Sequence, residues 1–120
     1  MENQTPRLNV ITEDDVTVVE LTDRKILDEV SIAQIGEELS DIIDKADGIR
    51  LVLDFKSIVH MSSSALSMLI TINKHVQQNG GRLVLCNISP PIHEAFTITR
   101  LNEVFKICVS LEKALAEAAS

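Results

Sequence analysis

One alternation in the sequence constrains the fold of this chain most. Short apolar runs alternate with segments in which apolar residues recur at every third or fourth position. One run contains Ile49 and 51–53, and a second spans Leu83–Cys86. Such runs are typical of strands buried on both faces of a parallel sheet. The apolar spacing over 32–46 and 65–76 predicts amphipathic helices that cover such a sheet.

The remaining segments complete this alternation. Leu8–Thr12 and Val16–Leu21 are rich in β-forming residues and predict a hairpin. A last strand is expected over Phe105–Val109. The predicted order is β-β-α-β-α-β-α-β-α, an α/β fold with a mainly parallel mixed sheet, right-handed crossovers and packed helices. The pattern leaves the order of strands within the sheet open.

Polar residues mark where the helices begin. Asp28 or Ser31 can cap the first helix, and Ser110 can cap the last one. Ser89 precedes two prolines, which predicts a hydroxyl cap and a short helix that runs to about Thr97.

Composition limits the class of protein. The chain has 120 residues, 45% of them apolar and 2% aromatic, which excludes a disordered chain and predicts an aliphatic core. At this length we expect a single domain over residues 1–120. The net charge of −7 disfavours binding to nucleic acid or to an anionic membrane.

The sequence also indicates where in the cell the protein is located. No apolar run approaches the ~20 residues of a membrane span, and residues 1–9 lack the pattern of a signal peptide. Cys86 and Cys108 stand far apart without metal-ligand or CxxC spacing, so we expect buried, reduced thiols that are inert. These features predict a cytoplasmic protein without a cofactor or a metal of its own.

Three consecutive hydroxyls, Ser62, Ser63 and Ser64, lie between the end of a buried strand and the start of an amphipathic helix. Ligands and modifications usually lie at this edge of an open α/β sheet. One interpretation is that one serine caps the helix and the others are solvated. The other is a phosphorylation site, because the helix N-terminus favours a negative charge.

Three motifs in register give the chain a family resemblance. They are LDF at 53–55 with MSSSAL at 61–66, GGRLVLCNISP at 80–90, and FTITRLNEVFKI at 96–107. Together they resemble the STAS domain of anti-sigma factor antagonists over nearly the whole chain. The resemblance implies a STAS-like fold and a bacterial regulator that acts by binding a protein partner, an anti-sigma factor with serine kinase activity.

The resemblance also implies site residues. By position, Ser63 matches the serine that the partner phosphorylates, with Ser62 and Ser64 as alternates. Phosphorylation ends the binding in that family. Two departures stand out, because Ser62 replaces an aspartate and Ala65 replaces a glycine. The expected partner-binding residues are Ser62, Ser63, Ser64, Ala65, Ser67, Thr71 and Lys74.

Other functions fit the sequence less well. A hydrolase would combine Ser63 with a histidine, but the chain has no G-x-S-x-G elbow, and the spacing of its histidines does not suit zinc. A receiver domain would need an acidic pair followed by a helix, whereas residues 13–15 lead into a strand. Asp54 is instead expected to accept backbone N–H groups of the next loop. The alternative that stays open is a STAS scaffold or adaptor without a working phosphorylation switch.

Overall fold

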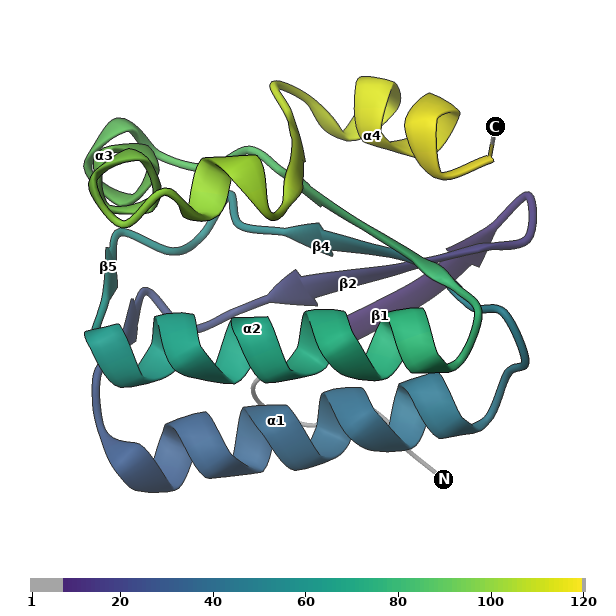
Figure 1. The fold of residues 1–120 in the computed structure, drawn as a ribbon, viewed down its shortest axis with the longest axis horizontal. Helices are drawn as coiled ribbons and strands as arrows, with labels where there is room; N and C mark the ends of the chain where they lie inside the picture. Colours follow the sequence, from purple (N-terminus) through teal and green to yellow (C-terminus); the bar gives the residue numbers. More distant parts are fainter. Residues whose placement is uncertain (1–7, 120) are drawn as a thin grey trace.

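Strands and helices alternate after an opening hairpin within residues 8–119, the part of the chain that this computed structural model describes (Figure 1). The first half contains β1 (Leu8–Glu13), β2 (Val16–Leu21), β3 (Lys25–Ile26), α1 (Glu29–Asp44), β4 (Arg50–Asp54) and β5 (His60–Met61). The second half contains α2 (Ser63–Gln78), β6 (Arg82–Cys86), α3 (Pro90–Ile98), the 3₁₀ turn η1 (Leu101–Glu103), β7 (Lys106–Cys108) and α4 (Leu111–Ala119).

The main sheet has the strand order β1-β2-β4-β6-β7. Only the β1–β2 pair is antiparallel, and the other three pairs are parallel. This confirms the predicted mainly parallel α/β fold. Asp14 and Asp15 form the tight turn of the opening hairpin with positive φ angles of 51° and 68°, a conformation that aspartate tolerates better than most residues.

Helices cover both faces of the sheet (Figure 1). On one face, α1 and α2 pack their apolar sides against alternate strand residues such as Leu51 and Leu53. On the other face, Ala114 and Ala118 of α4 pack against Val52, Val84 and Cys86. The central strands are therefore buried on both sides, as their unbroken apolar runs predicted.

Two of the three predicted hydroxyl or carboxylate caps form. The Asp28 carboxylate accepts the Ser31 N–H at 2.9 Å, and the Ser110 hydroxyl accepts the Lys113 N–H at 3.2 Å. For Ser89 the predicted helix start is confirmed but the hydroxyl cap is not: Ser89 occupies the N-cap position of α3, and its side chain makes no cap hydrogen bond. Pro91 stands at the second helical position and carries no N–H, which removes one of the two donors that a cap usually satisfies.

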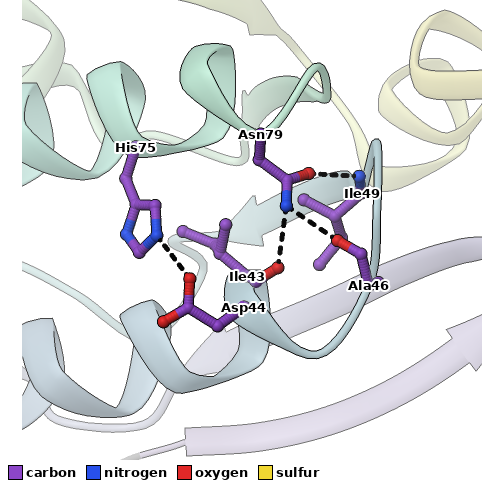
Figure 2. A network of polar contacts seen from close by, with 6 residues as sticks. All are labelled: Ile43, Asp44, Ala46, Ile49, His75 and Asn79. Atoms are coloured by element: carbon purple, nitrogen blue, oxygen red, sulfur yellow. Dashed lines mark hydrogen bonds and ion pairs between the residues drawn. The ribbon is translucent and has the colours of Figure 1, made fainter.

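Asn79 holds together the turns at one end of the fold (Figure 2). Its Nδ2 donates to the carbonyl oxygens of Ile43 at 3.2 Å and Ala46 at 2.8 Å, and its Oδ1 accepts the Ile49 N–H at 2.9 Å. One side chain at the end of α2 thus fixes the segment that leads from α1 into β4.

The last strand is shorter than predicted. The prediction placed it over Phe105–Val109, but β7 covers only Lys106–Cys108 and pairs with β6 alone. Cys108 is consequently half-buried, so the prediction of two buried thiols holds for Cys86 but not for Cys108. Because β7 lies at the edge of the main sheet, no further strand of that sheet covers its outer side.

Candidate functional site

The three serines lie where the strands of the main sheet end. β5, the beginning of α2 and α3 gather at this end of the molecule, on the left in Figure 1. Ser62 is the N-cap of α2, and Ser63 and Ser64 are its first two residues. The expected location at the carboxyl edge of the sheet is confirmed for the segment.

Ser62 has a structural role at this helix start. Its hydroxyl accepts the Ala65 N–H at 3.2 Å, and its own N–H donates to the Ile26 carbonyl at 3.0 Å. Its backbone is extended, with φ −85° and ψ 168°, which is the usual N-cap conformation. Serine at this position therefore does the capping that an aspartate would also do.

Removing this cap has a measurable cost. We expect Ser62→Ala to lower the free energy of unfolding by about 1 kcal/mol, because one N–H of the first turn loses its partner. Urea denaturation of the two proteins measures the difference. Ser64→Ala is the matched control and should change stability by less than ~0.5 kcal/mol, since this side chain is exposed. Equal losses in the two variants would contradict the capping role.

Ser63 and Ser64 are exposed, whereas Ser62 is half-buried. The first turn of α2 carries no acidic side chain, in contrast to α1, where Glu29 follows the Asp28 cap. The positive end of the α2 dipole is therefore not compensated by a carboxylate of its own first turn. An added negative group on Ser63 or Ser64 would meet favourable electrostatics there.

Ala65 does not belong to the exposed surface. Its side chain is fully buried, so the expectation that it contributes to a partner-binding surface is not met. Its N–H faces the Ser62 hydroxyl as the third residue of a regular helix, which places its methyl group towards the core. Alanine suits this position because the helical backbone needs no positive φ.

The loop before the serines is held in place by buried and half-buried groups. Asp54 is buried, and its Oδ1 accepts the Lys56 N–H and the Asn87 Nδ2, both at 3.0 Å. The Ser57 hydroxyl donates to Glu20 at 3.0 Å. The expected role of Asp54 as a strand-end acceptor is confirmed.

A second small sheet, which the sequence analysis missed, links the starts of α1 and α2. β3 and β5 pair in parallel, with Lys25 opposite His60 and Ile26 opposite Met61. The Arg24 carbonyl also accepts the Val59 and His60 N–H groups, at 2.7 and 3.2 Å. Strands of two residues are too short to show a periodic pattern, so no local signal could have found them.

Two exposed apolar side chains lie at the start of α1, the segment that this small sheet joins to the start of α2. Leu27 directly follows β3, and it is 51% exposed, while Val30 in the first turn of α1 is 66% exposed. On the other side, a shallow pocket of about 90 Å³ lies between β5, the start of α2 and α3. Its lining includes His60, Met61 and Pro91. Leu27 and Val30 are the surface residues that the sequence analysis did not find.

The predicted face of α2 is exposed. Ser67, Thr71 and Lys74 all point away from the core on successive turns. Thr71 also borders a groove of about 470 Å³ between α1 and α2, which Glu37 and Asp41 line from the α1 side. The structure thus brings Ser63, Ser64 and this face together on one continuous helix.

Of the three histidines, His60 lies close to the serines, two positions before Ser62, and is exposed. His75 pairs with Asp44 at 2.8 Å near the other end of α2 (Figure 2), about 18 Å along the helix from Ser63 at 1.5 Å per residue. His93 is exposed on α3. Across residues 8–119 no three His, Cys, Asp or Glu side chains cluster closely enough to hold a metal ion, and no helix is long and apolar enough to cross a membrane.

Comparisons with known proteins agree with the architecture. The family model of the STAS domain matches residues 7–114. A candidate anti-sigma factor antagonist of Bordetella bronchiseptica, BtrV, is 31% identical over 91 residues, which are 76% of this chain and 78% of that protein.

Solved structures show the same fold. An anti-sigma-factor antagonist (STAS) domain protein from Planctomyces limnophilus superposes with a TM-score of 0.85 at 23% identity, over 94% of this chain and 98% of the other. The Bacillus cell fate determinant SpoIIAA, solved in its phosphorylated form, superposes with a TM-score of 0.68 at 18% identity, over 92% and 97% of the two chains.

Proposed function

The chain belongs to the STAS domain family, and from this premise we propose that it binds an anti-sigma factor with serine kinase activity and is released when Ser63 is phosphorylated. In this proposal residues 1–120 form one STAS domain that acts in the bacterial cytoplasm by binding and not by catalysis. The likeness to BtrV, named as a candidate anti-sigma factor antagonist, supports the class of partner.

The observation that carries the proposal is the division of roles among the three serines. Ser62 is committed to the helix cap, while Ser63 and Ser64 present free, exposed hydroxyls on the first turn of α2. A kinase needs an acceptor hydroxyl that is accessible and has no structural duty. Ser63 also matches the family acceptor by position, which favours it over Ser64.

A phosphate on Ser63 would change the surface without unfolding the helix. It adds a charge of about −1.5 to −2 at neutral pH, and the α2 N-terminus, free of carboxylates, favours that charge. Lys25 and His60, paired across β3 and β5, are exposed next to this segment. The altered charge would act directly on a protein partner that binds at the start of α2.

The proposed partner surface combines this charge-sensitive point with apolar and polar neighbours. It consists of Ser63 and Ser64, the face formed by Ser67, Thr71 and Lys74, and the exposed apolar residues Leu27 and Val30. Apolar side chains supply much of the affinity at the centre of protein interfaces, and a charged rim supplies specificity. A phosphate on Ser63 would have to be desolvated when a partner covers this surface, which weakens the complex.

The test compares variants that differ only in charge at Ser63. Binding to the serine-kinase anti-sigma factor encoded in the same genome is measured by calorimetry without nucleotide. We expect Ser63→Asp to weaken binding at least tenfold, about 1.4 kcal/mol, and Ser63→Ala to bind but to accept no phosphate with ATP. Gln78→Asp, the same charge change at the other end of α2, is the control and should bind like the unaltered chain.

Two results would contradict the proposal. One is phosphorylation that persists in Ser63→Ala at the level of the unaltered chain. The other is binding by Ser63→Asp that equals that of the Gln78→Asp control. Peptide mass spectrometry of the protein from its own cells, with and without phosphatase, identifies the modified serine independently of the binding assay.

A second candidate function is a STAS scaffold or adaptor that has lost the switch. The departures at Ser62 and Ala65 favour it, because the family carries aspartate and glycine there. A chain that stays unmodified through growth and stress, yet binds other STAS proteins, would support this alternative. The Ser63→Asp substitution would then leave that binding unchanged.

A further inference from the structure

Two thiols face each other on neighbouring strands. Cys86 is the last residue of β6 and Cys108 the last residue of β7, and the two are direct partners in the parallel register. Both side chains pack into the cluster beneath α4, so they lie on the same face of the sheet. Both are free thiols, and nothing in the proposed switch at Ser63 uses them.

The spacing of neighbouring strands suits a bond between these residues. Strands in a sheet lie about 4.8 Å apart, and disulfides join Cα atoms that are about 4.4–6.8 Å apart. The Cβ atoms must approach to about 3.8 Å, which requires a small shift of one strand. β7 can make this shift, because it has three residues, lies at the sheet edge and pairs on one side only.

We propose that Cys86 and Cys108 are an oxidation site that forms a reversible intramolecular disulfide between β6 and β7. A bond between directly paired strand residues is more strained than one across a loop, and strained disulfides are the ones that are readily reduced. The site therefore suits a reversible modification and not a permanent crosslink.

The two thiols differ in access. Cys86 is fully buried. Burial first, and then the nearby Asp54 and Cys108, raise its pKa from 9.0 to about 12. Cys108 is half-buried and lines a groove of about 510 Å³ at the sheet edge, together with His93 and Lys106. An oxidant from solution therefore reaches Cys108 first.

The chemistry is a thiol–disulfide exchange with a low-molecular-weight disulfide such as oxidised glutathione. The Cys108 thiol loses its proton to water, and its sulfur attacks the reagent, which breaks the reagent S–S bond and expels one glutathione thiolate. The Cys86 thiol then loses its proton, attacks the Cys108 sulfur and expels the second glutathione. Two protein thiols are oxidised, and one glutathione disulfide is reduced to two thiols.

The bond would form next to the groups that position the serine loop. Cys86 is the register partner of Asp54, and its carbonyl accepts the Phe55 N–H at 3.0 Å. Asn87, which follows it, donates to the Asp54 carboxylate. The disulfide would therefore form beside the start of the loop that leads to Ser62.

The experiment treats the reduced full-length chain with oxidised glutathione, blocks the remaining thiols with N-ethylmaleimide and measures the intact mass. The unaltered chain should lose the mass of two hydrogen atoms, carry neither glutathione nor the blocking group, and revert with dithiothreitol. Cys86→Ser should stop at one glutathione on Cys108, because the resolving thiol is absent. Cys108→Ser should stay unmodified.

The rate at which the disulfide forms from the glutathione adduct should also rise with pH. Since the raised pKa keeps Cys86 protonated near neutrality, closure of the glutathione adduct should become about tenfold faster from pH 7 to pH 8. The proposal is overturned if the unaltered chain keeps a stable glutathione adduct or forms a crosslinked dimer. It is also overturned if N-ethylmaleimide blocks both thiols of the unaltered chain after a glutathione treatment that fully modifies the Cys86→Ser variant. A Cys108 that stays unmodified in the Cys86→Ser variant would overturn it as well.

Discussion

Asn79→Ala is expected to lower the free energy of unfolding by about 3 kcal/mol, a large share of the stability of a domain this size. The alanine removes three hydrogen bonds, to the carbonyls of Ile43 and Ala46 and from the N–H of Ile49 (Figure 2). These backbone groups lie at the end of α1 and in the turn that leads into β4, and they are partly buried. Water cannot replace all three partners without opening that turn.

Urea denaturation followed by circular dichroism measures this effect. Gln78→Ala is the matched control, because it removes an exposed amide from the adjacent position and should cost less than ~0.5 kcal/mol. Asn79→Asp distinguishes the contributions, since it keeps the acceptor for the Ile49 N–H and loses both donors. A loss in Asn79→Ala no larger than in Gln78→Ala would show that the turn does not depend on this side chain.

Gly81→Ala is expected to destabilise the protein by at least ~3 kcal/mol through a backbone clash. A Cβ at Gly81 would overlap the Ile49 carbonyl oxygen and lie 2.9 Å from the Ile49 nitrogen. Backbone atoms at the start of a buried strand cannot rotate away as a side chain can. The Arg82 N–H donates to the same Ile49 carbonyl at 2.8 Å, so relief of the clash would also disturb this hydrogen bond.

Gly80→Ala is the control for this prediction. Gly80 adopts a positive φ of 82°, but within residues 8–119 no atom beyond its chain neighbours lies within 4 Å of the position its Cβ would take. Its substitution should therefore cost only the ~1–2 kcal/mol of the left-handed conformation. Thermal or urea unfolding of both variants provides the comparison. If both variants lost the same free energy of unfolding, the backbone conformation, and not a clash with the Ile49 carbonyl, would explain why glycine is needed at both positions.

The sequence by itself predicted the order of the main elements. Apolar runs at 51–53 and 83–86 and the helical stripe at 65–76 depend on local periodicity, and the structure has β4, β6 and α2 at these places. Burial on both faces of the central strands is visible in a sequence because it leaves no polar residue in the run. The family motifs likewise located the serine segment at the start of α2.

The strand order and the small sheet were decided only by the tertiary structure. β3 and β5 each have two residues and are stabilised by hydrogen bonds to each other, across more than thirty intervening positions. No periodicity exists over two residues, so pairing of this kind appears only once the chain has folded. This pairing also brings the segment that precedes the exposed Leu27 to the start of α2, where the Ser62 N–H donates to the Ile26 carbonyl.

The roles of individual side chains divide in the same way. Residue type and position alone indicated three candidate hydroxyls, but the fold decided that Ser62 caps the helix while Ser63 and Ser64 stay exposed. It also buried Ala65 and placed Cys86 opposite Cys108, twenty-two positions apart in the chain. Local pattern determines which segment forms a strand or helix, whereas which side chains meet depends on long-range packing that brings distant segments together.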